Sequence, residues 1–576
     1  MLRILKKFNK ILDRRKKKII VAIIFLMIIG ALLEVFSVSM MVPLLTAIMQ
    51  PNFIEENKYA ALVCNIFDLH SERTFVILCI AGLILLFVIK DLFLIFEYYV
   101  QARFVYNNCF VLQNRLFIAY LSRTYKYFLY AKTGEILQVI QGSVNQAFSL
   151  LTMLMSFLTE SIISIALIGT IFVLSPIMTV FIAIVLLIVI FIIAKILKPL
   201  LEKFGSQNYE NGIEINKWIT QSVSGIKEIK VTQTKDYFQS NYEKHALALA
   251  TSHRKYEVLS NTPRLMIEMV SIAAMLLFVA FMLLKGNPIS EMLTLLGAIA
   301  MAAMKLLPSA NRIVTAFNSI SYGEIALDKV IENLQILESD HSELEPEGHP
   351  EKDLSFKHEV KIENLTFGYE GADDNVLDSV NMSIPIGKSV GIVGPSGAGK
   401  TTTVDILLGL LQPQSGCVTV DGQDIMTGYH SWLSHLNYIP QTIFMLDGTI
   451  RENIVFGQPY TGDDDVWNAL KEAQLYEFVK ALPAGLDTEI GERGVRISGG
   501  QRQRLGIARA LYTNPDILFF DEATSALDNE TEEAIMESIH ALHGKKTMII
   551  IAHRLTTIED CDIVYRVDNK KITRER

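Results

Sequence analysis

The chain has 576 residues, of which 51% are apolar and 20% charged, and its net charge is −8. That length corresponds to about three or four ordinary domains. No basic stripe accompanies the acidic balance, which argues against a nucleic-acid-binding protein. The five cysteines have no paired spacing, so the sequence indicates neither a disulfide framework nor a zinc site. Long uncharged runs occur only before about Pro308, which predicts a membrane-embedded half followed by a soluble half.

The membrane-embedded half begins with a basic segment. Met1 to Lys18 holds nine Lys or Arg and a single acid, Asp13, which favours a cytoplasmic N-terminus. A signal peptide is the alternative, but the apolar stretch that follows is too long for one and lacks a cleavage site. Six stretches are near or above the ~20 residues that cross ~30 Å of hydrocarbon as a helix. These predicted spans are residues 19–48, 74–99, 147–174, 176–197, 263–284 and 289–310.

The segments between the spans alternate in character. Residues 50–73 are acidic, and the links after Leu174 and Leu284 are short, which suits external connections. Residues 100–146 and 198–262 are long, polar and helix-patterned, so we expect them to enter the cytoplasm and reach a partner domain. Both termini are therefore predicted to be cytoplasmic.

Four cations lie in the inner half of the predicted spans, where a central charge costs roughly 2.5 to 3.5 kcal/mol. They are Lys90, Arg264, Lys305 and Arg312. One interpretation is a cationic cup that receives an anionic head group from the cytoplasmic leaflet. The alternative is that these cations snorkel to the interface or pair with intramembrane acids. Those acids are Glu34, Asp91, Glu160 and Glu268, the last spaced i, i+4 from Arg264.

A linker separates the two halves. The helical pattern continues to Leu337, and the acidic stretch that follows carries Pro346, Gly348 and Pro350. The predicted organisation is a transmembrane domain over residues 1–337, a linker over 338–355 and a soluble domain over 356–576.

The soluble domain contains a strand, a glycine-rich loop and a helix in succession. An apolar run from Ser389 to Val393 precedes the loop, which matches G-x-x-x-x-G-K-[ST] at every fixed position. Glycines let backbone N–H groups surround phosphates, and the helix N-terminus adds its positive end. Lys400 then reaches the outer phosphates and Thr401 holds Mg²⁺; a turn that merely closes a strand is the alternative. The residues assigned to the nucleotide are Gly394, Ser396, Gly397, Gly399, Lys400, Thr401 and Thr402.

Other candidate residues stand where an open α/β sheet meets its ligand, at the ends of strands. The apolar strand after Asp516 ends in Asp521, for the metal, and Glu522, to polarise an attacking water. His553 follows the next apolar strand and is placed to hydrogen-bond a phosphate, with a structural histidine as the alternative. Tyr369, 25 residues before the phosphate loop, is placed to stack on an adenine, or else is a core or surface tyrosine.

A second turn of small residues precedes a helix at Arg502 to Tyr512. It consists of Ser498, Gly499, Gly500 and Gln501, and it offers another anion-binding helix N-terminus. One phosphate loop already serves one nucleotide. The second site makes sense if it covers a nucleotide held by another copy of the domain.

Together these motifs resemble the nucleotide-binding domain of ATP-binding cassette (ABC) transporters, and the whole chain resembles an exporter half-transporter. The resemblance implies an all-α six-helix transmembrane domain plus an α/β P-loop NTPase domain, with ATP and Mg²⁺ as cofactors. It makes Gln441 the Q-loop residue at the metal, Asp528 the D-loop aspartate, Glu522 the catalytic carboxylate and His553 the switch histidine. It makes Ile497 to Gln501 the signature, in which Ile497 replaces the usual Leu, a volume-conserving change. It also implies a homodimer in the lipid bilayer whose cassettes sandwich ATP, and coupling helices near Tyr125 to Lys132 and Lys217 to Lys227.

A narrower resemblance concerns the substrate. The segment from Lys305 to Ile313 and the context of Arg264 look similar to bacterial lipid-linked oligosaccharide flippases, in which intramembrane cations are thought to engage a pyrophosphate. At Lys305 this chain has Lys for Arg, a point charge rather than a bidentate fork. The favoured function is an ATP-driven flippase that moves a lipid-linked sugar to the outer leaflet of the plasma (bacterial inner) membrane. A multidrug, lipid or peptide exporter is the same-class alternative, and a nucleotide-gated channel or regulator is the alternative from another class.

Overall fold

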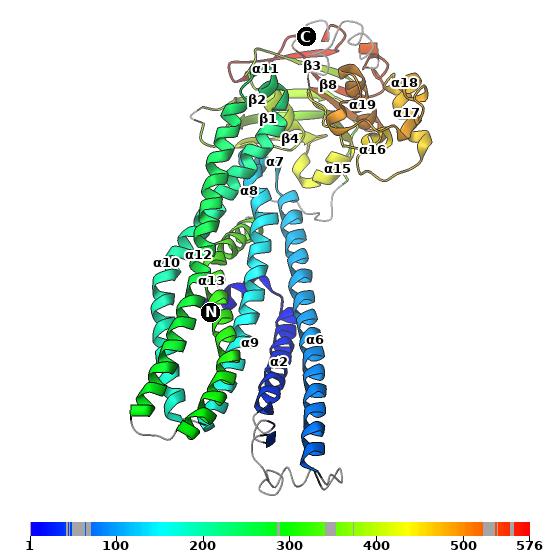
Figure 1. The fold of residues 1–576 in the computed structure, drawn as a ribbon. Helices are drawn as coiled ribbons and strands as arrows, with labels where there is room; N and C mark the ends of the chain where they lie inside the picture. Colours follow the sequence, from blue (N-terminus) through cyan, green and yellow to red (C-terminus); the bar gives the residue numbers. More distant parts are fainter. Residues whose placement is uncertain are drawn as a thin grey trace. The chain divides into compact units, whose positions relative to one another are not determined.

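The computed structural model describes residues 2–41, 44, 47–48, 64, 71–174, 176–284, 289–339, 353–372, 374–521, 536–537, 539–552 and 558–576. The chain forms two compact units (Figure 1). The helical unit comprises Met1–Arg123 with Tyr130–Ser342, and the sheet unit comprises Thr124–Leu129 with Glu343–Arg576. The short segment Thr124–Leu129, most of helix α7 (Tyr125–Tyr130), therefore belongs with the sheets although its chain neighbours belong with the helices.

The helical unit is built from long helices and a few short ones. They are α1 (Leu2–Ile11), α2 (Arg14–Ser39), α6 (Glu72–Leu121), α8 (Thr133–Leu137), α9 (Val144–Leu174), α10 (Pro176–Ser224), α11 (Ile226–Thr232), α12 (Lys235–Leu284) and α13 (Ile289–Ser339), with a π-helical stretch at Gln138–Ser143. Helix α9 packs along α13, and α10 packs along α12, as Figure 1 shows. Helix α13 thus places Ser309 and Arg312 beside Glu160 of α9, 149 and 152 positions away in the sequence.

Several helices are longer than the predicted spans that they contain. Helix α6 continues past residue 99 to Leu121, and α10 continues past 197 to Ser224. The polar segments expected to be helix-patterned are thus continuous with the apolar ones. Pro263, expected at the start of a span, instead lies inside α12, which begins at Lys235. A proline removes one helical hydrogen bond but does not end a helix that is held by packing, and Ile267, one turn further on, is completely buried.

Apolar side chains remain exposed along the helices, among them Leu32 on α2 and Ile84 and Ile95 on α6. Within the described residues, three stretches are long and apolar enough to cross a membrane: Arg14–Ser37, Arg73–Leu121 and Thr133–Gly169. The other three predicted spans lie on helices whose side chains are only partly described. Those three stay predictions.

The sheet unit contains an antiparallel sheet and a mostly parallel one. The first has the strand order β2-β1-β4-β5 and the second β10-β9-β3-β8-β7-β6. The strands are β1 (Glu359–Phe367), β2 (Leu377–Pro385), β3 (Ser389–Val393), β4 (Ser415–Val420), β5 (Gln423–Asp424), β6 (Leu436–Ile439), β7 (Ile517–Asp521), β8 (Thr547–Ile551), β9 (Ile563–Asp568) and β10 (Lys571–Arg574). The helices are α14 (Lys400–Leu407), α15 (Tyr429–Ser434), α16 (Ile450–Val455), α17 (Asp463–Glu472), α18 (Tyr476–Lys480) and α19 (Gly499–Tyr512).

The parallel strands determine where the candidate site forms. Every residue of β3, β7 and β8 is buried, as expected for strands covered on both faces. Ile551 pairs with Ile392 on one side and with Asp521 on the other, and Phe520 pairs with Ile439. The carboxyl ends of β3, β6, β7 and β8 therefore meet at one edge, and the loops that follow them gather there.

Candidate functional site

The loop between β3 and α14 has a backbone that only glycine accommodates. Gly394 has a φ of +150°, and a Cβ there would lie 2.1 Å from the carbonyl oxygen of Val567. Gly399, at the N-terminus of α14, has a φ of +101°. The Lys400 ammonium is buried and donates to the carbonyl oxygens of Gly394 and Pro395, at 3.0 Å each. The predicted phosphate loop is thus preformed, with its lysine inside the curve.

The predicted adenine contact is tied to the same helix. The Tyr369 hydroxyl lies 3.0 Å from Thr402 Oγ1, and the Phe367 ring packs against the Tyr369 ring edge to face. Thr402 is buried, whereas Thr401 and Ser396 are exposed. Thr401, which carries the predicted metal-binding hydroxyl, is thus exposed to solvent, and the neighbouring Thr402 contacts Tyr369.

A buried carboxylate lies at the end of β7, next to the strand that leads to Gln441. Asp521 is 6% exposed, and its Oδ2 accepts a hydrogen bond from the Tyr438 hydroxyl at 3.1 Å. Tyr438 is on β6, three residues before Gln441, which is exposed. We did not identify Tyr438 in the sequence, although its place on a strand ending at the ligand edge was a usable signal.

A second carboxylate lies close to Asp521. Burial, and next the charge of Asp521, raise the pKa of Asp405 on α14 to about 6. Burial and the same aspartate also raise the pKa of the Tyr438 phenol. Negative charge is therefore concentrated at this edge of the sheet, and the nearby hydroxyl and amide oxygens are hard ligands. This chemistry fits Mg²⁺ held by Thr401, Gln441 and Asp521.

The second predicted anion site begins α19. The Ser498 hydroxyl accepts from the Gln501 backbone N–H, and the Gln501 side chain accepts from the Ser498 backbone N–H. Ser498 and Gly499 are exposed, and Gly500 is buried. This reciprocal capping box holds the turn open on the surface, and it satisfies two of the helix's free donors.

Three predicted residues lie outside the described part of the chain: Glu522, Asp528 and His553. Glu522 directly follows the last residue of β7, and His553 comes two residues after the end of β8. Their assigned roles remain predictions.

In the helical unit, the structure pairs two of the four predicted cations with acids. The Lys90 ammonium lies 3.2 Å from Glu34 Oε2 and 3.1 Å from Asp91 Oδ1, and the lysine side chain is 6% exposed. It also lies over the Phe87 ring, 4.6 Å from its centroid. These contacts match the pairing alternative, because a buried, neutralised ammonium is part of the helix packing.

Arg312 on α13 is paired in a different way. Its Nη1 lies 2.5 Å from Glu160 Oε1 on α9, and the other carboxylate oxygen accepts from the Ser309 hydroxyl. Glu160 is buried, yet the Arg312 side chain is 66% exposed. Nη1 of the guanidinium is therefore bound to the Glu160 carboxylate, while most of the Arg312 side chain is exposed to solvent.

Arg264 and Lys305 complete the set. Arg264 is exposed on α12, and no ion pair joins it to Glu268, so the pairing suggested by their spacing is wrong in the described structure. The Lys305 backbone belongs to α13, and its side chain lies outside the described residues.

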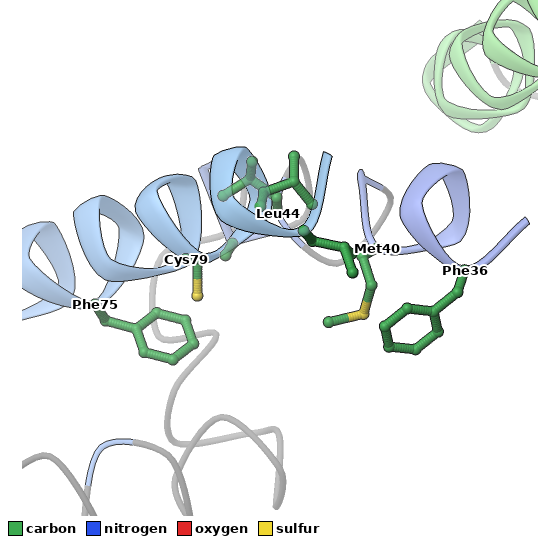
Figure 2. Close-up of a pocket in the computed structure, with 9 residues that line it drawn as sticks. Phe36, Met40, Leu44, Phe75 and Cys79 are labelled. Carbon is green, nitrogen blue, oxygen red and sulfur yellow. The ribbon is translucent and has the colours of Figure 1, made fainter. Parts of the chain in front are cut away.

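An apolar pocket of about 360 Å³ lies between α2 and α6. Figure 2 shows Phe36 of α2 and, from the residues that follow this helix, Met40 and Leu44. Phe75 and Cys79 come from α6. Its other described lining residues are Ala47, Gly82, Leu83 and Leu86, so no charged side chain lines it among the residues that the structure describes. It offers apolar surface on the same two helices that carry the Lys90 and Glu34 pair.

The first predicted coupling helix contacts the nucleotide region of the sheet unit. The Lys126 ammonium of α7 forms an ion pair with Glu370, the residue after Tyr369. Burial and the charges of Asp405 and Tyr369 raise the pKa of the Tyr125 phenol. The segment Thr124–Leu129 is thus next to the predicted adenine loop.

The segment predicted as the second coupling helix, Lys217 to Lys227, is not one separate helix. Lys217 to Ser224 continue α10, and the separate short helix is α11, at Ile226–Thr232. Gly225 has a φ of −97° and a ψ of 24°, which are not helical values, so the break falls at this glycine.

A preformed phosphate loop beside a strand-end carboxylate, in a chain that also carries long apolar helices, defines a membrane protein with a P-loop nucleotide-binding domain. The ABC transporter sequence profile matches residues 377–525, and that of the ABC transporter transmembrane region matches residues 20–304. A multidrug resistance ABC transporter ATP-binding and permease protein of Lactococcus lactis is 30% identical over 78% of this chain and 75% of its own length. The chain belongs to the ABC transporter family.

Two further proteins are similar to it. An ATP-dependent lipid A-core flippase of Saccharophagus degradans is 35% identical over 61% of this chain, which spans 59% of that flippase's length. The structure of a bacterial Atm1-family ABC exporter with ATP bound matches with a TM-score of 0.77 over 97% of this chain and 95% of that one, at 24% identity. This confirms the predicted fold class, a helical transmembrane region followed by an α/β ATPase domain.

Proposed function

We propose that this protein is an ATP-driven flippase that moves a lipid-linked, pyrophosphate-bearing sugar from the inner to the outer leaflet of a bacterial inner membrane. The observation that carries the substrate class is the geometry at Arg312. Its guanidinium is held by Glu160, whose other carboxylate oxygen accepts from Ser309, while the Arg312 side chain is 66% exposed, so donors remain available. A planar, oriented guanidinium matches the oxygens of a phosphate group.

An amphipathic substrate also needs apolar surface. The described residues that line the pocket between α2 and α6 are apolar or small, which suits a hydrocarbon chain. The similarity to a protein named a lipid A-core flippase supports a lipid substrate. Arg264, exposed on α12, is the second candidate for the anionic part, with Lys305 as the third. Lys90 is assigned to helix packing because its charge is neutralised by Glu34.

ATP supplies the energy in this proposal. The phosphate loop binds the triphosphate, and Thr401, Gln441 and Asp521 would hold Mg²⁺, which would neutralise charge on the phosphates. Glu522 polarises the attacking water, and His553 orients it against the terminal phosphate. Ser498 and Gly499 are exposed at the start of α19, which is compatible with covering a nucleotide held by a second copy. We therefore propose a homodimer in which Asp528 also lies at the shared site.

Coupling to the membrane helices would pass through α7. Lys126 is ion-paired with Glu370, the residue after Tyr369, which we propose stacks on the adenine. Movement of that loop on ATP binding would therefore reach the segment that joins α6 to α8. An exporter of drugs is the second candidate, and the Lactococcus relative named for multidrug resistance favours it.

Reconstitution in liposomes tests the substrate. ATPase activity is measured with a pyrophosphate-linked lipid sugar, the same lipid carrying a neutral head group, and a panel of hydrophobic drugs. We expect stimulation by the pyrophosphate lipid alone. Stimulation by drugs but not by the lipid sugar would support the drug exporter instead.

Two variants locate the anionic contact. Arg312→Lys keeps a charge for Glu160 but loses the fork, and Arg264→Gln removes an exposed cation. Both should lower the lipid-stimulated rate and leave the basal rate unchanged. Lys357→Gln, an exposed lysine of the sheet unit, is the matched control. Full stimulation in both variants would remove these residues from the substrate site.

A further inference from the structure

The N-terminal segment presents a fixed basic surface. Of its nine cations, six are exposed: Arg3, Lys6, Lys10, Arg14, Arg15 and Lys18. The segment contains one acid, Asp13, whereas the whole chain has a net charge of −8. Positive charge is therefore concentrated at this end of the protein. We call these six side chains the N-terminal basic surface.

Helix α1 is anchored to the helical unit by its other face. Ile4, Phe8 and Ile11 are each less than 7% exposed, and the Phe8 ring packs edge-on against Phe148 of α9. Apolar side chains at this spacing share one helix face, so the exposed cations project from the rest of α1. The helix is thus a packed element rather than a solvated tail.

One cation of α1 has a structural task. The Lys7 ammonium lies 2.5 Å from Glu324 and 2.6 Å from Asp328, both on α13. Arg3 approaches Glu324 at 3.7 Å but remains 81% exposed. Lys7 therefore fixes α1 to α13. Lys7 is not one of the six side chains of the N-terminal basic surface, and Arg3, which is one of them, remains exposed.

The basic surface leads directly into an apolar helix. Helix α2 begins at Arg14 and becomes apolar at Ile19, and it is long and apolar enough to cross a membrane. The cations of α2 therefore stand at the membrane surface. A cluster of four to eight cations next to a membrane helix attracts anionic lipid head groups.

We propose that the N-terminal basic surface binds anionic phospholipid head groups of the cytoplasmic leaflet. The occupant is a lipid already in the bilayer, not the transported substrate. A basic segment that only sets the orientation of the first span needs no lipid preference once the protein has folded. A lipid-binding surface retains that preference in the purified protein. Because α1 is tied to α13, bound anionic lipid would also steady the helix from which the chain continues into the linker.

The test uses the full-length protein in nanodiscs made from equal amounts of phosphatidylglycerol and phosphatidylcholine. After extraction, the two lipids that stay with the protein are quantified by mass spectrometry. The variant Lys6→Gln/Lys10→Gln/Arg14→Gln/Arg15→Gln is compared with the wild type. Each cation near an anionic surface contributes about a five-fold preference, so the variant should lose at least about ten-fold of the enrichment.

The control removes the same charge elsewhere, by changing Lys357, Lys471, Lys480 and Lys545 of the sheet unit to Gln; all four are exposed. It should retain the wild-type enrichment. Equal enrichment in the N-terminal variant, or equal loss in the control, would overturn the proposal. Wild-type protein provides an independent arm: its enrichment should collapse between about 0.1 M and 1 M salt, where the screening length falls from ~10 Å to ~3 Å. Enrichment that salt does not affect would also overturn it.

Discussion

Replacing Lys90 by Met should destabilise the helical unit more than replacing Lys90 and Glu34 together. The two side chains are 6% and 11% exposed, and their charged atoms are 3.2 Å apart. Lys90→Met has a similar length but leaves the Glu34 carboxylate buried without the ammonium that balances its charge. Removing one member of a buried ion pair costs about 3–5 kcal/mol, whereas replacing both by apolar groups is often nearly neutral. Asp91, which is 61% exposed, stays solvated and adds little to the cost.

The assay is thermal unfolding of the full-length protein in detergent, followed by intrinsic fluorescence. A chain of two units is not expected to unfold in a single step, so the order of apparent Tm values is the result to compare. We expect wild type and Lys90→Met/Glu34→Met to be similar, and Lys90→Met alone to be clearly lower. Lys329→Met is the control, because its pair with Glu332 is exposed and worth less than about 1 kcal/mol.

Two results would refute this reasoning. One is a single variant as stable as the wild type, which would mean that the carboxylate is not left buried. The other is a stable double variant that keeps basal ATPase but no longer moves substrate, which would make Lys90 a substrate contact rather than a packing residue.

Three further predictions concern the sheet unit. Lys126→Glu should reduce substrate-stimulated ATPase, and the charge-swapped Lys126→Glu/Glu370→Lys should recover much of it; no recovery would mean that the ion pair does not carry the coupling. Tyr438→Phe removes the hydrogen bond to Asp521 and should raise the Mg²⁺ concentration for half-maximal hydrolysis by about ten-fold, a shift that an unchanged Mg²⁺ titration would contradict. The pKa of Asp405 is raised to about 6 in the folded protein, from an ordinary value near 4. The carboxyl therefore ionises more readily in the unfolded chain, and the free energy of unfolding falls as the pH rises from about 4 through 6. Asp405→Asn should therefore raise the apparent Tm of the nucleotide-free protein at pH 7.5 but not at pH 4, and an equal effect at both would argue against a buried charge.

Local patterns in the sequence accounted for much of the architecture. The strand before Gly394 and the glycines after it are a short-range signal, because each φ value is set by a single residue. The apolar runs of α6 and α9 are equally local. The polar segments that adjoin the predicted spans keep the helical pattern. Helix α10 therefore continues after its predicted span, and α12 begins before its own.

Contacts between distant segments were not predictable in the same way. Lys126 meets Glu370 across 244 positions, and Tyr438 meets Asp521 across 83. The partners of Lys90 and Arg312 were among the candidate acids, but only the packing of the helices selects Glu34 and Glu160. The break between α10 and α11 falls at Gly225, inside the segment predicted as the second coupling helix, where no break was predicted.

Whether ATP hydrolysis drives a lipid-linked substrate across the membrane can be measured by one comparison in sealed proteoliposomes. Wild-type protein and Glu522→Gln are reconstituted equally, and the appearance of a pyrophosphate-linked lipid sugar in the opposite leaflet is followed after ATP addition. The wild type should transfer lipid only when ATP is present, and Glu522→Gln should still bind ATP but neither hydrolyse it nor transfer lipid. Equal transfer with and without ATP, or full hydrolysis by Glu522→Gln, would contradict the proposed function.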